Sequence, residues 1–327
     1  MTSILVLGEL TENNSLDSVT GELIAAGRQI GEDIGVALIG SDLDERANET
    51  ITLGASSVYT VDDEALTGRE IAPKVTAFAE VCNQTSPDVI LVGKTQDGRE
   101  VGPRVAFRLG AGLAQDCIRV GVDADTGRVV ATRPVYGGSA MAAVTFPGDG
   151  PQVVVMRGRA YEPSEHDASR TGDVIPVAVD LSASSNRVRN IRTVAQASEG
   201  VRLEDADIVV AGGRGLGGPE PFELVGQLAD LLGGAMGASR AACDAGWIDH
   251  SYQVGLTGRT VAPNVYITVG ISGASQHMAG CSGAKHIVAI NKDREANIFK
   301  DASYGVVGDW EAVIPSFMET VRDLVDS

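Results

Sequence analysis

Two glycine-rich turns that follow apolar strands are the segments whose residue types could bind an anion. The first, Gly212–Gly218, comes directly after the apolar run Ile208–Ala211, and Gly213, Gly215 and Gly218 fit a GxGxxG pattern. Glycines in such a turn let the backbone approach a pyrophosphate at a helix N-terminus. The acidic residue expected near the end of the next strand has no clear candidate. A nicotinamide site and a turn that serves only packing therefore both remain open.

The second turn is more specific, because it combines glycines with hydroxyl groups. Val269–His277 reads Val-Gly-Ile-Ser-Gly-Ala-Ser-Gln-His and follows the apolar run Val265–Val269. A strand that enters a helix through a Gly-Ser-Gly turn presents backbone N–H groups and a hydroxyl to an anion. Two further turns, Gly237–Arg240 and Val254–Gly258, also place a hydroxyl or a cation after glycine. Four such loops in one region predict a large, phosphate-bearing ligand.

The elements that must position these loops follow from the spacing of apolar residues. In the first third of the chain, apolar runs alternate with stretches of amphipathic spacing such as 69–83; the runs are Ile4–Leu7, Val36–Ile39, Ser57–Thr60 and Val89–Val92. This alternation predicts βαβ units and a parallel sheet. The same alternation restarts at Ile208 and ends in a helix near 312–325.

Between these regions the pattern changes twice. Four β-rich stretches separated by turn residues, 118–123, 129–134, 141–146 and 153–156, predict antiparallel hairpins added to the first sheet. The segment from Ser182 to Gly200 then loses its apolar runs and becomes polar. We place a domain boundary there. The sequence thus predicts an α/β protein of two domains, residues 1–190 and 200–327.

Composition excludes several classes of protein. The chain has 327 residues, enough for two cores, and its 26 Lys and Arg against 44 Asp and Glu give a formal charge of -18. Such a charge disfavours binding to nucleic acid or to an anionic membrane. No apolar run approaches the roughly 18 residues that span a bilayer, and the four scattered cysteines show no metal or disulfide pattern. We expect a soluble, cytoplasmic protein with no metal site.

The second half of the chain resembles a known family. The run from Tyr266 through Gly270-Ile271-Ser272-Gly273 and Gln276-His277 to Asn291-Lys292-Asp293 resembles the C-terminal signature of the electron transfer flavoprotein alpha subunit, or FixB, family. Gly213-Arg214-Gly215, residues 236–241, Asp244-Ala245-Gly246 and residues 304–309 support the resemblance. In the first domain it extends to the βα layout and to residues 95–100.

The resemblance implies a fold, a cofactor and partners. The first domain, with its mostly parallel sheet, would pack against a beta subunit. The second would bind FAD in a domain like the nucleotide-binding domain of deoxyhypusine synthase. The protein would pass single electrons between flavin dehydrogenases, such as those of the acyl-CoA type, and a further acceptor. Some members of the family relay electrons and others bifurcate them from NADH, and the sequence fits both branches.

The resemblance also implies which residues contact FAD. The expected contacts follow the predicted strands and are Arg214, Ser239, Arg240, Val254, Gly255, Leu256, Thr257, Ser272, Gly273, Ala274, Ser275, Gln276, His277, Asn291, Asp309 and Trp310. One of them departs from the family pattern, because Leu256 stands where a Gln is usual. The side-chain amide is lost there, although a backbone contact could survive.

Several of these residues have roles that physical chemistry suggests. A flavin that takes one electron at a time needs positive charge or hydrogen-bond donors near the pyrimidine end of its ring, and Arg240 and His277 are our candidates. A surface ion pair and a packing role are their simpler readings. Thr257 and Ser272 could offer hydroxyls to the ring or phosphate, and both also suit ordinary turns. For Asn291 and Asp309 the alternatives are an Asx-turn and a helix cap.

Two other functions remain open at this stage. A nicotinamide-dependent dehydrogenase would use Gly213, Gly215 and Gly218 and would bind NAD tightly as an isolated chain. A partner module that keeps the fold but has lost the flavin is suggested only by Leu256, and would be colourless even with its beta subunit.

Overall fold

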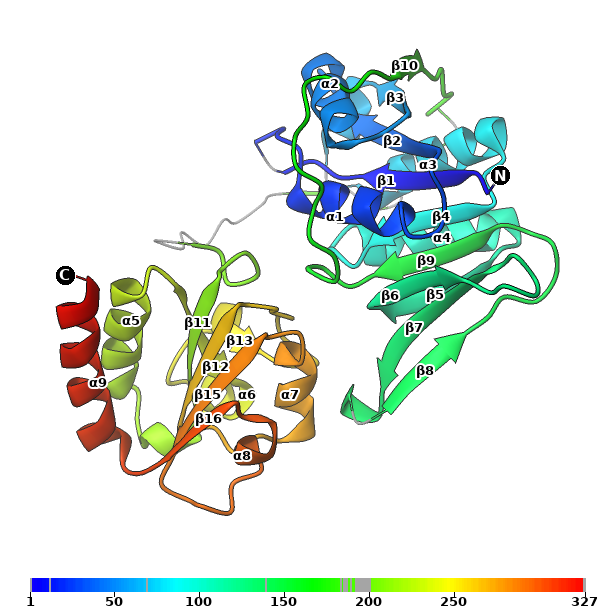
Figure 1. Ribbon diagram of the computed structural model, residues 1–327. Helices are drawn as coiled ribbons and strands as arrows, with labels where there is room; N and C mark the ends of the chain where they lie inside the picture. Colours follow the sequence, from blue (N-terminus) through cyan, green and yellow to red (C-terminus); the bar gives the residue numbers. More distant parts are fainter. Residues whose placement is uncertain are drawn as a thin grey trace. The chain divides into compact units, whose positions relative to one another are not determined.

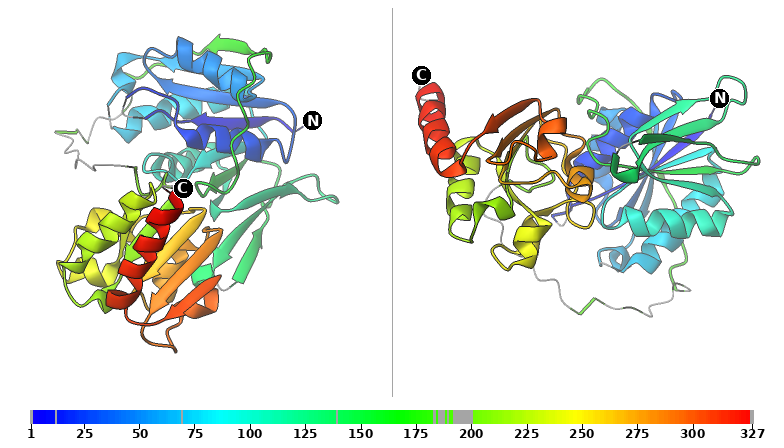
Figure 2. Two further views of the ribbon diagram at one scale, coloured as in Figure 1. Left: turned by 60° about the vertical axis from the view of Figure 1, so that its left-hand side comes forward. Right: turned by 90° about the horizontal axis from the view of Figure 1, so that it is seen from below.

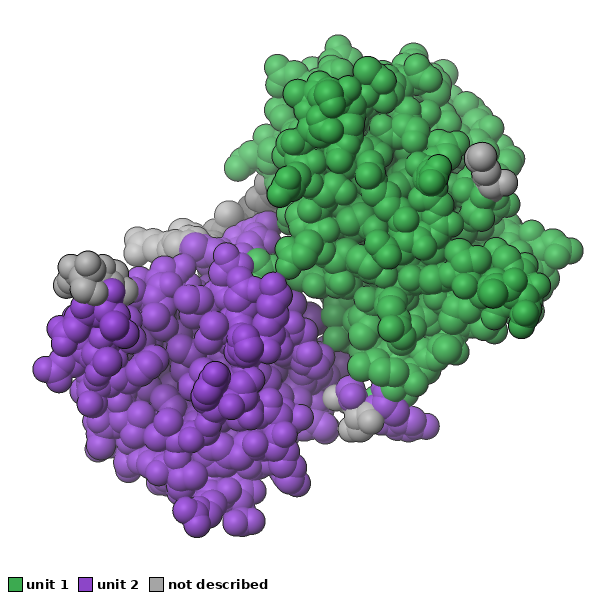
Figure 3. Space-filling model, in the orientation of Figure 1, with its two compact units in different colours: residues 1–135, 141–194 green, residues 136–140, 195–327 purple. Residues whose placement is uncertain are grey.

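The chain divides into two compact units in a computed structural model that describes residues 2–11, 13–68, 70–138, 140–182, 184, 188, 190–191 and 201–325. Unit 1 comprises Met1–Val135 with Met141–Val194, and unit 2 comprises Tyr136–Ala140 with Ala195–Ser327 (Figure 3). The expected boundary segment, 182–200, lies largely outside the described residues.

Unit 1 is built on a seven-stranded sheet in the order β10-β3-β2-β1-β4-β9-β5, in which every neighbouring pair is parallel (Figure 1). Its strands are β1 (Ile4–Gly8), β2 (Ile34–Gly40), β3 (Ser57–Asp62), β4 (Val89–Gly93), β5 (Gly112–Cys117), β9 (Gln152–Met156) and β10 (Asp173–Pro176). The helices are α1 (Ser18–Gly27), α2 (Asp44–Leu53), α3 (Ile71–Thr85) and α4 (Gly98–Leu109), with a 3-10 turn, η1 (Glu64–Leu66). The predicted parallel sheet is confirmed.

Both faces of this sheet are buried. Successive residues of β1 alternate between two cores: Ile4 and Val6 pack with α1 and α2, whereas Leu5 and Leu7 pack with α3 and α4. Strands buried on both faces are apolar throughout rather than alternately polar, which is why the runs were visible in the sequence.

Of the four predicted β-rich stretches, only 153–156 extends this sheet, as β9, and it pairs in parallel with both neighbours rather than as a hairpin strand. Strands β6 (Arg119–Val122), β7 (Val129–Val135) and β8 (Ala140–Val144) form a separate three-stranded sheet, with the 3-10 turn η2 (Tyr136–Gly138) between the last two. The pairing of β6 with β7 is antiparallel, as expected. The expectation of one sheet was wrong because the register shifts between Gln115 and Cys117, where Asp116 has a φ of 62°, and the chain leaves the large sheet.

Asp116 also anchors an ion cluster at the carboxyl end of the large sheet. Arg157, after β9, donates to both of its carboxylate oxygens at 2.9 Å, and Lys94, after β4, donates to one at 2.8 Å. Burial alone would raise the pKa of Asp116, but the hydrogen bonds from Arg157 and Lys94 outweigh it and hold the pKa below its usual value.

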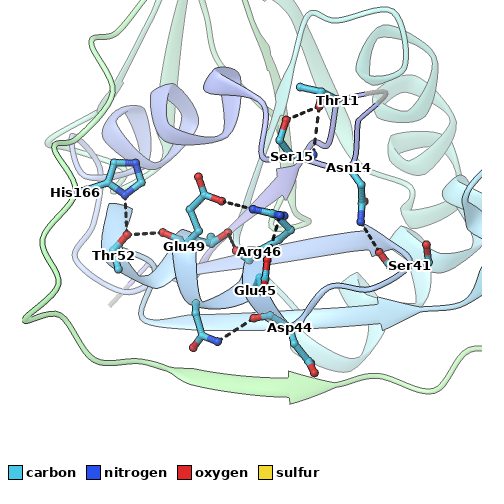
Figure 4. A network of polar contacts seen from close by, with 12 residues as sticks. Thr11, Asn14, Ser15, Ser41, Asp44, Glu45, Arg46, Glu49, Thr52 and His166 are labelled. Atoms are coloured by element: carbon cyan, nitrogen blue, oxygen red, sulfur yellow. Dashed lines mark hydrogen bonds and ion pairs between the residues drawn. The ribbon is translucent and has the colours of Figure 1, made fainter.

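A network of polar contacts joins the loops around α2 (Figure 4). The Asn14 side-chain amide donates to the Ser41 carbonyl at 3.1 Å, which links the β1–α1 loop to the β2–α2 loop. At the other end of α2, the Thr52 hydroxyl and the Nδ1 atom of His166 lie 2.8 Å apart. His166 therefore contributes to the structure of unit 1.

Unit 2 is a six-stranded sheet in the order β13-β12-β11-β14-β15-β16, again with every pair parallel. Its strands are β11 (Ile208–Gly212), β12 (Ala235–Ser239), β13 (Gln253–Val254), β14 (Val265–Val269), β15 (His286–Asn291) and β16 (Tyr304–Val307). The helices are α5 (Pro221–Leu231), α6 (Arg240–Asp244), α7 (Ser275–Cys281), α8 (Ile298–Asp301) and α9 (Trp310–Val325), with the 3-10 turns η3 (Arg214–Leu216) and η4 (His250–Tyr252).

Helices cover both faces of this sheet as well. Helices α5, α6 and α9 share one core with Ile267 and Ile290, and α5 and α9 lie side by side (Figure 2). Helices α7 and α8 share the other core with Tyr266 and Ala289. Within the described part of the chain, no helix has both the length and the apolar character to cross a membrane.

The ion cluster of unit 1 generates a first prediction. Replacing Asp116 by Asn keeps its size and its tolerance of positive φ but removes the charge that Arg157 and Lys94 contact. We expect Asp116→Asn to lower the free energy of unfolding of unit 1 by about 2 kcal/mol at pH 7, measured by urea denaturation.

Two controls make this specific. Glu100→Gln removes one partner of the exposed Glu100–Arg104 pair and should cost less than about 0.5 kcal/mol. Because the folded pKa of Asp116 is lowered, its contribution is complete above the unfolded pKa of about 4 and disappears as the pH falls through the folded value. An equal loss for both variants at pH 7 would contradict the prediction.

Candidate functional site

The carboxyl-terminal edge of the unit 2 sheet collects all the residues that the sequence singled out. Since all pairs in this sheet are parallel, every strand ends at the same edge. The residues at or after the six ends are Arg214 after β11, Ser239 and Arg240 after β12, Val254–Thr257 at β13, Ser272–His277 after β14, Asn291 at β15, and Asp309 with Trp310 after β16. Ligands of open α/β sheets bind at this edge.

The glycines of the first turn are needed for contact between two loops. The Gly213 N–H donates to the Val269 carbonyl at 2.8 Å, and the Gly215 N–H donates to the Gly270 carbonyl at 3.0 Å. A Cβ on Gly213 would lie 2.3 Å from the Gly270 oxygen, and one on Gly215 would lie 2.7 Å from it. Gly270 itself has a φ of 65°. These glycines therefore serve the packing of the two loops against each other.

The same turn lacks the geometry of a nicotinamide site. Its 3-10 turn η3 follows the strand directly, and α5 begins only at Pro221. Glu220 and Glu223 bring carboxylates to the start of α5, where a phosphate would need positive potential. These features count against the dehydrogenase alternative.

Ser239 and Arg240 mark the end of β12. The Ser239 Oγ atom is buried and has no hydrogen-bond partner among the described residues. Arg240 is exposed, and its Nε donates to the Asp244 carboxylate at 3.2 Å, one turn along α6. The surface ion pair expected as the alternative role of Arg240 is therefore present. It leaves most of the guanidinium accessible at the edge.

The β13 loop is held mainly by backbone contacts. The Leu256 N–H donates to the Gln276 carbonyl at 2.7 Å, so that this N–H already has a partner inside the chain. Leu256 is 64% exposed. A Cβ on Gly280 would lie 2.4 Å from Gly255, so α7 approaches the loop backbone directly.

Gln253 is a functional candidate that sequence reasoning missed. It is buried at the start of β13, and its side-chain amide donates to the Thr257 hydroxyl at 3.0 Å. The side-chain oxygen of Gln253, Oε1, lies 3.1 Å from the Nδ1 atom of His250. Gln253 therefore orients Thr257. A polar residue next to a predicted ligand loop was the only available signal.

Three other predicted residues hold neighbouring loops. Asn291 donates to the Ile271 carbonyl at 2.9 Å and accepts from the Asp293 N–H at 3.0 Å. Asp309 accepts from the Glu311 N–H at 3.1 Å at the start of α9. The Ser272 carbonyl accepts from the Ile298 N–H at 3.1 Å, whereas its side chain is exposed. The Asx-turn and helix-cap alternatives for Asn291 and Asp309 are thus both present.

Of the two roles expected for His277, positive charge or hydrogen bonding, its surroundings suit only the second. It is 7% exposed, and its Nε2 atom lies 2.9 Å from the hydroxyl of Tyr266, which is fully buried. Burial lowers the pKa of His277 to about 4, and the Val254 backbone opposes this shift only in part. The ring is therefore neutral at pH 7 and can act only as a hydrogen-bond donor or acceptor.

The buried polar atoms at this edge fit a bound cofactor. Besides Ser239 Oγ, the Nδ1 atom of His277 is buried without a hydrogen bond of normal geometry to the described chain. Buried polar atoms are nearly always paired, so these two atoms leave hydrogen-bonding capacity that a bound group could use. With exposed Arg214 and Arg240 beside them, they suit a ligand that combines phosphates with a polar ring.

Comparisons with known proteins agree with this geometry. Residues 4–182 match the model of the electron transfer flavoprotein domain, and residues 202–282 match that of the electron transfer flavoprotein FAD-binding domain. The electron transfer flavoprotein subunit alpha of Megasphaera elsdenii is 43% identical over 98% of this chain and 96% of that protein. The protein of the same name from Bacillus subtilis is 43% identical over 98% of both chains. Protein FixB of Clostridium saccharobutylicum is 38% identical over 95% of this chain and 94% of that protein.

The contact between the two glycine loops generates a second prediction. Gly270→Ala introduces a Cβ at a φ of 65° and only 2.9 Å from the Gly215 backbone. We expect it to lower the free energy of unfolding of unit 2 by about 3 kcal/mol or more, and to lower the flavin content of the purified protein.

Gly233→Ala is the matched control. Gly233 has nearly the same φ, 64°, but a Cβ there would meet nothing within 4 Å. Gly233→Ala should lower the free energy of unfolding only by the cost of a positive φ in a residue with a Cβ, about 1 kcal/mol, and should leave the flavin content unchanged. Equal losses in the two variants would mean that the loop contact has no special importance.

Proposed function

Because this chain belongs to the electron transfer flavoprotein alpha subunit family, we propose that it pairs with a beta subunit and carries electrons on an FAD bound at the carboxyl-terminal edge of the unit 2 sheet. It would take electrons from a flavin dehydrogenase, of acyl-CoA type or related, and pass them to a further acceptor. The observation that supports this most directly is the gathering of polar and cationic residues from six strand ends around two buried, unpartnered polar atoms.

The residues at the edge would divide the work of holding FAD. Arg214 would neutralise phosphate, and the Ser239 hydroxyl would donate to or accept from a polar atom of the cofactor. Thr257, oriented by Gln253, would present its hydroxyl to the ring. The bound FAD supplies the redox chemistry. The chain fixes where it lies and which charges surround it.

Arg240 is the residue on which we place the electrostatic role. It keeps its charge at any physiological pH, whereas His277 is neutral. Its Nε is held by Asp244, which leaves the terminal nitrogens of the guanidinium to face a negatively charged ring. In this proposal the positive charge comes from Arg240 alone, and His277 supplies a neutral hydrogen bond.

Unit 1 would provide the surface for the beta subunit. The small sheet carries exposed apolar side chains, Val122 at 46% and Met141 at 59%, and Phe107 on α4 is 88% exposed. Exposed apolar side chains of this kind are available to be covered by a partner chain.

The visible spectrum of the chain, co-purified with its beta subunit, tests the proposal. We expect flavin absorption that bleaches on anaerobic reduction by a flavin dehydrogenase with its substrate. Direct reduction by NADH without a dehydrogenase would identify the bifurcating branch of the family. A colourless complex that retains the beta subunit would overturn the FAD assignment.

Replacement of Arg240 tests the electrostatic role. A charge-assisted hydrogen bond of about 1.5–3 kcal/mol corresponds to roughly 60–130 mV in a one-electron potential. We expect Arg240→Ala to lower the potential for the first electron by an amount up to this range, measured by spectroelectrochemical titration of the complex.

Arg202→Ala is its control. Arg202 is also exposed and paired, with Asp205, but it precedes β11 and so belongs to the opposite edge of the sheet. It should leave the potential unchanged. If both variants shift the potential alike, general charge rather than the position of Arg240 is responsible.

A further inference from the structure

Tyr266, in the core below the proposed cofactor site, is hydrogen-bonded to His277, the one buried histidine of the chain. Tyr266 is the second residue of β14, has none of its surface exposed, and packs in one core with Val209, Met278 and Ile287. The hydroxyl is the only polar group of its side chain, and it lies 2.9 Å from the Nε2 atom of His277 in the first turn of α7. The two rings are tilted by 36° with centroids 6.0 Å apart, so they do not stack.

This bond determines the protonation of the histidine ring. Burial raises the pKa of Tyr266 well above its usual value, so the hydroxyl keeps its proton at pH 7. His277 is the only hydrogen-bond partner that the structure gives this hydroxyl within the described chain. A hydroxyl proton in an apolar core needs an acceptor, and an imidazole nitrogen accepts only when it carries no proton.

A neutral imidazole carries one proton. If Nε2 accepts from Tyr266, the proton lies on Nδ1, which becomes a donor. Nδ1 is the buried atom that has no hydrogen bond of normal geometry to the described chain. The tyrosine hydroxyl therefore makes Nδ1 an N–H donor on the side of the ring away from Tyr266, and the Val254 backbone accepts from the ring only outside normal hydrogen-bond geometry.

We propose that Tyr266 is a positioning residue, which holds His277 in the orientation and the Nδ1-protonated tautomer that present one N–H donor to the FAD. This inference rests on the proposed function. Tyr266 does not touch the cofactor and acts only through His277. A phenylalanine would fill the same space in the core, so the hydroxyl is the part of the side chain that this role requires.

The tautomer can be measured directly. The chain contains four histidines, of which His166, His250 and His286 are exposed. In the complex labelled with ¹⁵N-histidine, the signal lost in His277→Gln identifies His277. We expect it to show a protonated Nδ1 and a bare Nε2, and not to titrate between pH 5 and 8, because burial lowers the pKa of His277 to about 4.

Tyr266→Phe removes only the hydroxyl. We expect the Nδ1-protonated signal to be lost or to mix with the Nε2-protonated form, and the potential for the first electron to fall. Tyr304→Phe is the control, because Tyr304 is 68% exposed in the same unit and should change neither quantity. Unfolding by urea shows whether Tyr266→Phe keeps the fold. If the variant does not fold, the tautomer of His277 in the unaltered protein still tests the proposal.

The outcomes separate this inference from the proposed function. An Nε2-protonated His277 in the unaltered complex, or an unchanged tautomer in a folded Tyr266→Phe variant, would overturn the role of Tyr266 even if FAD is bound. An unchanged potential with a changed tautomer would overturn the link to the cofactor. A complex without flavin but with the expected tautomer would overturn the proposed function and confine Tyr266 to ordering His277.

Discussion

Parallel pairing of every strand in unit 2 is the constraint on which the candidate site depends. Residues separated by about a hundred positions, such as Arg214 and Asp309, share one edge only because no strand of this sheet reverses direction. Parallel strands need crossover helices, and these bury both faces of the sheet. Because both faces of the sheet are buried, polar side chains can gather only on the loops at the strand ends. The site therefore lies at the edge of the sheet.

The loops at that edge are fixed by each other. Gly213 and Gly215 lie against Gly270, and Asn291 bonds the carbonyl of Ile271, so the ends of β11, β14 and β15 form one connected layer. These glycines and Asn291, which a sequence motif would assign to ligand binding, hold the loops together in the structure. The hydroxyl of Ser239 and the Nδ1 atom of His277 stand out because the layer leaves them unsatisfied.

Sequence reasoning predicted what depends on composition and periodicity. The strands β1, β4, β11 and β14 were visible because doubly buried strands are continuous apolar runs. The edge strand β16 was missed, since all four of its residues are exposed and no core pattern marks it. The separate small sheet depends on one register shift beside Asp116. The neutral state of His277 depends on its burial, and its hydrogen bond to Tyr266 is a contact between side chains that has no signal in spacing.

The close approach of Gly280 to Gly255, together with the hydrogen bond from the Leu256 N–H to the Gln276 carbonyl, determines which substitutions this loop tolerates. One wall of the site is made from main chain, whose shape survives a change of side chain. Leucine at position 256 can therefore replace a polar residue without dismantling the loop. A change at the exposed Leu256 side chain therefore leaves this wall in place, whereas a Cβ on Gly280 would collide with it.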